Sequence, residues 1–234
     1  MHPTAFLIPL AFVLATDDPD RTAEQAAALK SLREATADQM TFFRAPSERA
    51  FAKIRDGIEE NADASGLKDA NVLPSVAFLA AAAEKHGYAV PGESRSLVAA
   101  RAVLEGEESN PWTAFILDDS LTPSRMDVWW NRYFATGDEE NIRRVLRQIN
   151  PELERPQPKD GRPPSREELM PWALSETAKW SFNSIGKKLP EVAGFAVFAV
   201  EEPEFEAIKP FLLASLAGKK ISARAREELR RRGD

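Results

Sequence analysis

The sequence predicts a mainly α-helical protein, an irregular array of antiparallel helix pairs with at most one or two short strands. Glycine is scarce, with 11 of 234 residues, whereas alanine, the strongest helix former, is abundant. Strict alternation of apolar and polar residues, which marks half-buried strands, is hard to find. Apolar residues instead recur at three- and four-residue spacing, which gathers them on one face of a helix.

Composition limits the classes of function. The chain is 43% hydrophobic and 29% charged, a normal balance for a protein with a packed core. Its formal net charge of −6 argues against a general nucleic-acid binder, which needs a basic face to neutralise phosphates. The chain has no cysteine, so disulfides, thiol catalysis and thiolate metal sites are excluded.

The first residues are typical of a secretory signal peptide that covers residues 1–15. An apolar run from Ala5 to Ala15 ends in small residues suited to a cleavage site, and an acidic segment follows. No Lys or Arg precedes the run, so the alternative is a buried N-terminal helix of a cytoplasmic protein. Because a spanning helix needs roughly 20 apolar residues, we expect no permanent membrane span and a periplasmic or secreted protein.

Residues 16–218 are expected to form a single helical domain, with a subdivision near 107–120 as an alternative. The helices expected in its first half are Arg21–Asp38, a helix capped by Ser47 that carries Phe51, Ile54 and Ile58 on one face, a helix from Asn71 through Pro74 to a stop at Gly87, and Ser96–Glu105. The segment Thr113–Asp119 fits a strand or an apolar connector equally well.

The most patterned segment is Met126–Asn150. One helical face gathers Met126, Trp130, Tyr133 and Phe134. Trp129 falls at the edge of this face, so we expect Trp130 in the core and Trp129 at a rim, in contact with a partner. Gly137 suits a left-handed helix stop, and Asp138 suits the N-cap of the next helix. The apolar stripe of that helix is Ile142, Val145, Leu146 and Ile149. The two helices are expected to form an antiparallel hairpin.

Further signals follow in the second half. The proline-rich segment 151–164 predicts an exposed loop. Ser165 and Glu168 have the spacing of a capping box, and Pro171 interrupts or restarts the helix that follows. The segment Val192–Val200 fits a buried strand or a buried helix. A last amphipathic helix is expected to carry Phe205, Ile208, Phe211, Leu212 and Leu216, although Pro210 within it is unfavourable for a helix. Residues 219–234 are expected to be a polar, frayed tail.

Few residues suggest catalysis or metal binding. After removal of the signal only His86 remains, at a helix end where an imidazole commonly contacts terminal carbonyls, so a multi-histidine zinc site is excluded. None of the common nucleotide-binding, calcium-binding or hydrolase motifs occurs in full. We therefore expect no cofactor and no metal, and we assign no catalytic residue.

A hydrolase is nevertheless the alternative interpretation. Ser184 and Lys187 have the spacing of a serine activated by a lysine one helical turn away, without the companion motifs. The carboxylate pairs are Asp118 with Asp119 and Glu107 with Glu108. Adjacent residues on a helix or strand diverge, so neither pair is well placed to act on one bond.

Arginines are the remaining candidate binding residues. They are Arg132, Arg143, Arg144 and Arg147. Together they could form a cationic patch for an anionic partner, and with Trp129 they are the residues expected to bind another protein or a peptide. The alternative is that the arginines form salt bridges with Glu139, Glu140 and neighbouring helices.

The segments MDVWWNRYFATGDEENIRRVLRQI and ALSETAKWSFNSIGKKLPEV resemble a poorly characterised family of exported bacterial helical proteins. That family carries an aromatic helix ending in FATGD, a following helix with an IRR motif, and a later helix with a WSLxS motif. The matching positions are Trp130, Phe134, Ala135, Thr136, Gly137, Asp138, Ile142, Arg143, Trp180, Ser181 and Ser184. Trp129 and the pair Lys187–Lys188 depart from the pattern. The resemblance covers the second half of the chain and implies a tetratricopeptide-like arrangement and an envelope location, with no reaction attached.

These observations favour a noncatalytic, exported helical interaction or scaffold protein of the bacterial envelope. Stacked helix pairs often present a concave surface to another protein or peptide. A hydrolase with a Ser/Lys or carboxylate site stays the second expectation.

Overall fold

The structure, a computed structural model, describes residues 37–62, 69–107, 109–110, 113, 116, 123–159 and 161–233. The expected signal peptide and most of the expected helix Arg21–Asp38 lie outside the described residues. Within Thr113–Asp119 only Thr113 and Ile116 are described, and both are helical.

The described residues are mainly helical and form no sheet, which confirms the predicted fold class. Their one isolated β-bridge joins Lys159 to Arg162. The chain divides into two compact units, Met1–Asn141 (unit 1) and Ile142–Asp234 (unit 2). These units do not divide near 107–120, the alternative break that the sequence suggests, and the single helical domain stays a prediction. The break lies later because α7 (Pro123–Thr136) packs on α4 (Asp69–His86) and so belongs to the first unit.

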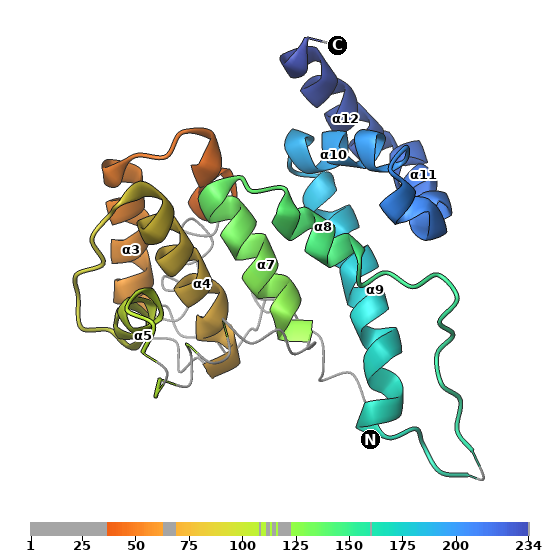
Figure 1. Cartoon of the computed structure of the whole chain (residues 1–234), viewed down its shortest axis with the longest axis horizontal. Helices are drawn as coiled ribbons and strands as arrows, with labels where there is room; N and C mark the ends of the chain where they lie inside the picture. The colour runs from red at the N-terminus through yellow and green to blue at the C-terminus, as the bar shows by residue number, and fades with distance from the viewer. Residues whose placement is uncertain are drawn as a thin grey trace, which may run out of the picture. The chain divides into compact units, whose positions relative to one another are not determined.

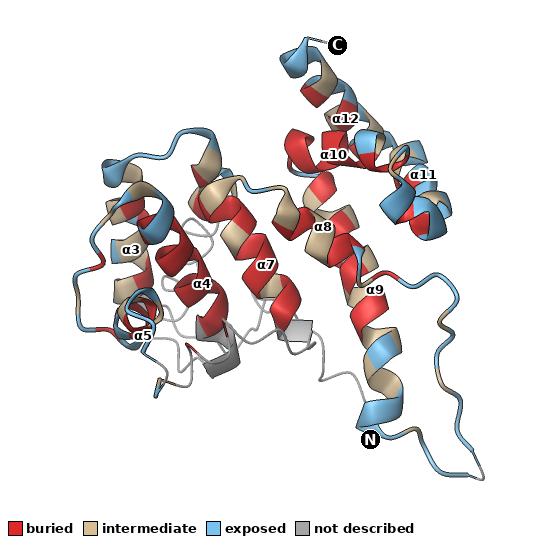
Figure 2. Cartoon of the chain, viewed as in Figure 1, coloured by how far each residue is buried: buried red, intermediate tan, exposed pale blue. Residues whose placement is uncertain are grey.

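The described helices of unit 1 surround α4. Unit 1 also contains η1 (Phe42–Arg44), α3 (Glu48–Ala62) and α5 (Arg95–Leu104) (Figure 1). Helix α4 packs against α3, α5 and α7, and every residue from Leu73 to Ala83 is buried (Figure 2). A helix that is apolar all round must be covered on several sides. None of the described helices is both long enough and apolar enough to cross a membrane.

Local signals set the start of α3 and the end of α4 as predicted, whereas α4 begins at Asp69, two residues before the expected Asn71. The buried face of α3 carries Phe51, Ile54 and Ile58. The hydroxyl of Ser47 accepts a hydrogen bond from the backbone N–H of Ala50 at 3.2 Å, as an N-cap residue does. Helix α4 ends at His86, and the next residue, Gly87, has a φ of +71° and donates its N–H to the carbonyl of Ala83 at 2.8 Å.

The C-terminal ends of α4 and α7 are joined by side chains of α4. Lys85 Nζ donates to the carbonyl of Thr136 at 2.5 Å, and His86 Nε2 lies 3.4 Å from the carbonyl oxygen of Ala135. Both contacts satisfy carbonyls that have no partner inside α7. His86 therefore contacts terminal carbonyls as predicted, but those of α7 and not those of its own helix.

Aromatic rings fill much of the remaining core of unit 1. Phe42 of η1 meets Phe78 of α4 edge-on, with ring centroids 5.3 Å apart. The ring centroid of Tyr133 in α7 lies 5.0 Å from that of Phe43 and 6.3 Å from that of Trp130. Such ring pairs stabilise by about 0.5–1.5 kcal/mol beyond the burial of their area.

The joint after α7 is built as predicted. Gly137 has φ +68°, and its N–H donates to the carbonyl of Tyr133 at 2.7 Å. Asp138 Oδ1 accepts from the backbone N–H of Glu140 at 3.1 Å, which caps α8 (Glu140–Leu146). The antiparallel hairpin of α7 and α8 would span the boundary between the two units, and it stays a prediction.

Beyond the boundary, unit 2 contains the rest of α8 followed by α9 (Arg166–Gly186), α10 (Pro190–Ala199), η2 (Pro203–Ile208), α11 (Lys209–Ala217) and α12 (Lys219–Arg232). The segment that fits either a strand or a helix is therefore the helix α10. Pro190 stands in its first turn, where proline favours a helix start, and residues 190–196 are all buried.

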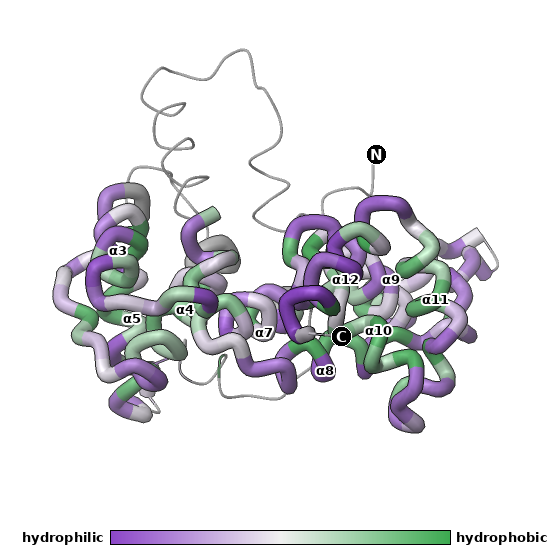
Figure 3. Tube along the Cα trace, turned by 90° about the horizontal axis from the view of Figure 1, so that it is seen from above, coloured by the Kyte–Doolittle hydropathy of each residue, from purple (hydrophilic) through white to green (hydrophobic). Residues whose placement is uncertain are grey.

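The segment 219–232 is polar as predicted but is not a frayed tail, because it forms the helix α12, which packs on α10. Ile221 and Ala225 of α12 pack against Ala193 of α10. Gly194 lets the helices approach closely, since a Cβ at this position would lie 2.5 Å from Glu228 Cγ. The apolar stripe of α12, Ile221 and Ala225, belongs to a hydrophilic helix and is buried where α12 packs on the hydrophobic α10 and on α11 (Figure 3).

Prolines and caps explain the other helices of unit 2. Ser165 and Glu168 form the predicted capping box, with backbone-to-side-chain bonds of 3.2 and 2.7 Å. Helix α9 then continues through Pro171 without a break. Pro210 lies in the first turn of α11. It therefore marks the start of a new helix after η2 and does not interrupt a longer one. The loop 151–164 carries mostly exposed residues over its described part, as predicted.

Candidate functional site

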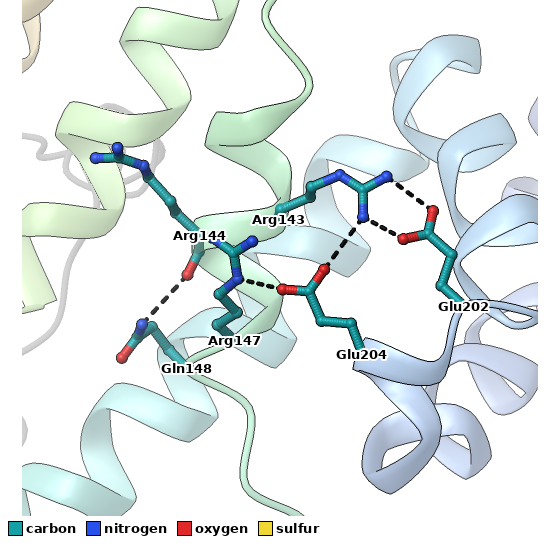
Figure 4. A network of polar contacts seen from close by, with 6 residues as sticks. All are labelled: Arg143, Arg144, Arg147, Gln148, Glu202 and Glu204. Atoms are coloured by element: carbon teal, nitrogen blue, oxygen red, sulfur yellow. Dashed lines mark hydrogen bonds and ion pairs between the residues drawn. The ribbon is translucent and has the colours of Figure 1, made fainter.

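The predicted arginine patch is partly used for contacts inside unit 2. The guanidinium of Arg143 donates to both carboxylate oxygens of Glu202, with Nη2 2.8 Å from Oε1, and its Nη1 reaches Glu204 at 3.3 Å (Figure 4). Arg147 Nε donates to Glu204. The salt-bridge alternative therefore holds for Arg143 and Arg147, with partners supplied by Glu202, just before η2, and by Glu204 in its first turn.

Aromatic rings support this ion pair. The guanidinium carbon of Arg143 lies 5.1 Å from the ring centroid of Phe195 and 5.7 Å from that of Phe205. The hydrogen bonds that Arg143 donates to Glu202 raise the pKa of Arg143, and the same bonds lower the pKa of Glu202 below its usual value. Arg143 is thus held as part of the fold and is poorly placed to receive a partner.

The other predicted binding residues do not join this network. Arg144 points away from both glutamates, and its carbonyl accepts from Gln148 at 3.3 Å (Figure 4). Arg132 belongs to unit 1, where it lines a pocket of about 130 Å³ together with Glu84 and Leu104. Trp129 is only 5% exposed, so its predicted rim position is wrong.

The hydrolase candidates are not assembled into a site. Ser184 is half-buried in the last turn of α9, whereas Lys187 is exposed at its C-cap. No hydrogen bond joins these two side chains among those found for the described residues. Glu107 is exposed, and Asp118, Asp119 and Glu108 lie outside the described residues. Nor does any group of three or more potential ligands in the described part of the chain form a candidate metal site.

A different site lies in unit 2, where the end of α9 meets the end of α11 and the start of α12. It is a pocket of about 410 Å³, here named the lysine pocket. Its lining residues are Asn183, Lys187, Phe211, Ala214, Ser215, Gly218, Lys219, Lys220 and Ile221. The pocket thus combines apolar walls with three lysines, and no acidic residue lines it.

The start of α12 adds to the positive potential of the lysine pocket. The N-cap residue is Gly218, which has no side chain to satisfy the first amides of the helix, and no acidic residue lies in the first turn. The unpaired N–H groups at a helix start carry a partial positive charge. An anion in this pocket would therefore meet both backbone and side-chain donors.

Two residues that line the pocket each carry a buried side-chain polar atom that has no hydrogen-bond partner in the described structure. The atoms are Ser215 Oγ and Asn183 Oδ1. Ser215 as a whole is only 7% exposed. Buried polar atoms are nearly always satisfied in folded proteins, and an unsatisfied one calls for an explanation such as a bound ligand.

Sequence reasoning missed this pocket because it assigned residues 219–234 to a tail. One local signal was present: Gly218, without a capping side chain, precedes two lysines and an isoleucine. Two other lining residues come from elsewhere in the chain: Lys187 follows the end of α9, and Phe211 belongs to α11. Only the packing of α9, α11 and α12 brings them to the start of α12.

Comparisons of the chain with models of protein families, with curated proteins and with solved structures found no significant match. A function must therefore be inferred from the chemistry of the described sites.

Proposed function

We propose that this protein is a noncatalytic interaction protein that binds a segment of another protein or a peptide at the lysine pocket of unit 2. The observation that carries the proposal is the combination of apolar walls with a rim of three lysines in a pocket of about 410 Å³. In protein interfaces an apolar side chain commonly anchors in such a pocket, while charges at the rim select the partner.

Exposed apolar side chains on the same helices support the proposal. Leu213 of α11 is 51% exposed, and Trp180 of α9 is 42% exposed. Trp180 precedes Asn183 by three residues, so the two side chains are neighbours on the surface of α9. Aromatic residues are enriched in protein interfaces, and Trp180 gives the partner an apolar surface next to the pocket.

A hydrolase has less support than a binding protein. Lys187 is exposed at the end of α9 and makes no hydrogen bond to Ser184 among those found for the described residues, whereas a serine nucleophile needs its base within hydrogen-bond reach. In the lysine pocket Lys187 is better suited to attract an anion.

We further propose that the protein is exported and belongs to the envelope family whose motifs it resembles. The support is the apolar run Ala5–Ala15 and the FATGD joint of the sequence. Expression of the full chain in a Gram-negative host, followed by fractionation and N-terminal sequencing, tests this. A mature chain that begins at Thr16 in the envelope is expected, and an intact Met1 in the cytosol would contradict export.

Crosslinking from a defined position tests the interaction. A photoreactive phenylalanine analogue replaces Leu213 in the full-length protein, which is expressed in the organism that encodes it. A matched control variant carries the analogue at Ala223, an exposed position of α12. The expected result is a discrete adduct from position 213 only, lost when Lys219 and Lys220 are both changed to Glu. Equal labelling from both positions, or an adduct insensitive to the lysines, would contradict the proposal.

A further inference from the structure

We infer that the lysine pocket binds the free carboxyl terminus of a peptide whose last residue is apolar. This inference rests on the proposed function and specifies the part of the partner that enters the pocket. It follows from the charge of the pocket, from its apolar walls and from the two polar atoms without partners.

The charge of the pocket selects an anion. Lys187, Lys219 and Lys220 line it, and the start of α12 presents amides that no side chain caps. Ser215 adds a buried hydroxyl without a partner, which is able to donate to an anionic oxygen. A carboxylate has two acceptor oxygens and would accept from the hydroxyl, the helix start and a lysine at once.

The walls exclude a purely inorganic anion as the best ligand. Phe211, Ala214 and Ile221 line the same pocket as the lysines. Ile221 is only 2% exposed, so the apolar wall is continuous with the core beneath α12. A ligand that fills this pocket needs an apolar group a few bonds from its charge, as in the last residue of a peptide.

Asn183 favours a peptide terminus over a fatty acid as the ligand. Its Oδ1 is a buried acceptor without a partner, so the ligand should supply a donor close to its anionic group. The backbone N–H of a terminal residue lies in that position, whereas an alkyl carboxylate has no donor. Capture of a terminal carboxylate by backbone amides is a recurring mode of peptide recognition.

The size of the pocket agrees with this ligand. Ligand sites usually measure about 300–1,000 Å³, and the lysine pocket measures about 410 Å³. It is therefore large enough for a short terminal segment and too small for a folded element. The partner would insert its end into unit 2 and leave the rest of its chain outside.

A peptide array tests the inference with the full-length protein. Pentapeptides with four randomised positions and a terminal leucine, valine or phenylalanine are tethered by their N-termini. Each is present as the free acid and as the C-terminal amide. Free acids should bind, and amidation should weaken binding at least about tenfold, as expected for the loss of one charge-assisted contact.

Matched variants locate the binding. Changing Lys219 and Lys220 to Gln should weaken free-acid binding at least about tenfold. Changing Arg226 and Arg230 to Gln lowers the net charge by the same amount as the lysine double variant. Both arginines are exposed on α12 and lie outside the pocket, so binding should be unchanged. Ser215→Ala should weaken binding, with the thermal unfolding of every variant measured as a check on folding. Equal losses in the two double variants would show a general charge effect and overturn the site.

Other outcomes separate this inference from the proposed function. Equal binding of acids and amides that still requires the lysines would overturn carboxyl-terminal recognition and leave a peptide-binding pocket. Competition by inorganic phosphate without preference for an apolar end would show a simple anion site, and preferential binding of laurate would show a fatty-acid site. Either result, or no binding of any peptide, overturns the inference, whereas the proposed function is judged by the crosslinking from position 213.

Discussion

Unit 1 and unit 2 are both helical over their described residues, yet different contacts hold their helices together. In unit 1 the helix α4 is buried from Leu73 to Ala83, and rings of η1, α4 and α7 pack against one another. In unit 2 the helices α10 and α12 cross closely at Gly194, and ion pairs surround the crossing. Glu191, for example, accepts from Arg231 at 2.5 Å.

This difference predicts that the two units respond to different perturbations. Burial of rings is not screened by salt as ion pairs are, and it depends on shape and volume, so unit 1 should be sensitive to truncation of large side chains. Ion pairs that are partly exposed are screened by salt, and a close helix crossing tolerates no added volume. Unit 2 should therefore be sensitive to small additions, to acid and to salt.

The largest effect is expected from the two adjacent tryptophans of unit 1. Trp129 and Trp130 are 5% and 3% exposed, so replacing either with alanine should lower the free energy of unfolding by about 3–5 kcal/mol. Urea unfolding followed by circular dichroism measures the change. A much smaller loss for Trp129→Ala than for Trp130→Ala would restore the rim position that the sequence favours for Trp129.

A single methyl group should have the next largest effect, in unit 2. Gly194→Ala places a Cβ 2.5 Å from Glu228 Cγ and 2.8 Å from its Cβ, so α10 and α12 must move apart, at a cost of about 1–3 kcal/mol. Gly186→Ala is the matched control, because its Cβ would meet neighbours only at 3.9 Å. If both variants unfold at the same temperature, the crossing is looser than its contacts indicate.

Asp127 of unit 1 should give a pH dependence of its own. Burial raises the pKa of this half-buried carboxyl from 3.8 to about 7. The folded state binds the proton more tightly, so stability should be greatest below about pH 4 and should fall as the pH rises to about 7. Asp127→Asn should remove this slope and stabilise the protein above pH 7 by about 1–2 kcal/mol, a value reduced for partial exposure. Urea titrations of the wild type and of Asp127→Asn across this pH range measure the effect. If the free energy of unfolding depends on pH equally in both proteins, Asp127 is well solvated and the prediction is wrong.

The smallest effect is expected from the ion pair between Arg143 and Glu202 in unit 2, and its pH dependence has the opposite sign. Hydrogen bonds from Arg143 lower the pKa of Glu202 below 4.5, so the stabilisation is present above that pH and is lost as the pH falls through the lowered value. Glu202→Gln should reduce stability near neutral pH by about 0.5–1 kcal/mol, and less at high salt. A double-mutant cycle with Arg143→Gln measures the coupling, and a coupling unaffected by salt would contradict a screened surface pair.

Local signals in the sequence predicted much of the fold, and their successes share one property. The capping box of Ser165 and Glu168 and the joint at Gly137 and Asp138 each depend on residues within a few positions of one another. The burial of Trp130 follows from the apolar face of its own helix. Trp129 was misplaced because its burial comes from neighbouring elements, which helical spacing alone does not reveal.

The candidate site was less predictable than the fold. The sequence singled out Arg143 and Arg147 but not Glu202, which lies 59 residues after Arg143 and converts a candidate binding residue into a structural one. It also treated Lys219 and Lys220 as part of a tail, although the lysine pocket depends on them. Both errors concern partners that are distant in the chain.

The sequence by itself determined that this protein is helical and where many of its helices begin and end, because hydrogen bonds, caps and apolar spacing act over four residues or fewer. Only the tertiary structure decided which helix faces meet, where the chain divides and which charged groups stay open to a ligand. These choices depend on the packing of surfaces that are remote in the chain. The narrow stripe of α12 is buried because Gly194 of α10 leaves room for it, and that burial brings the start of α12 to α9 and α11, where the lysine pocket lies.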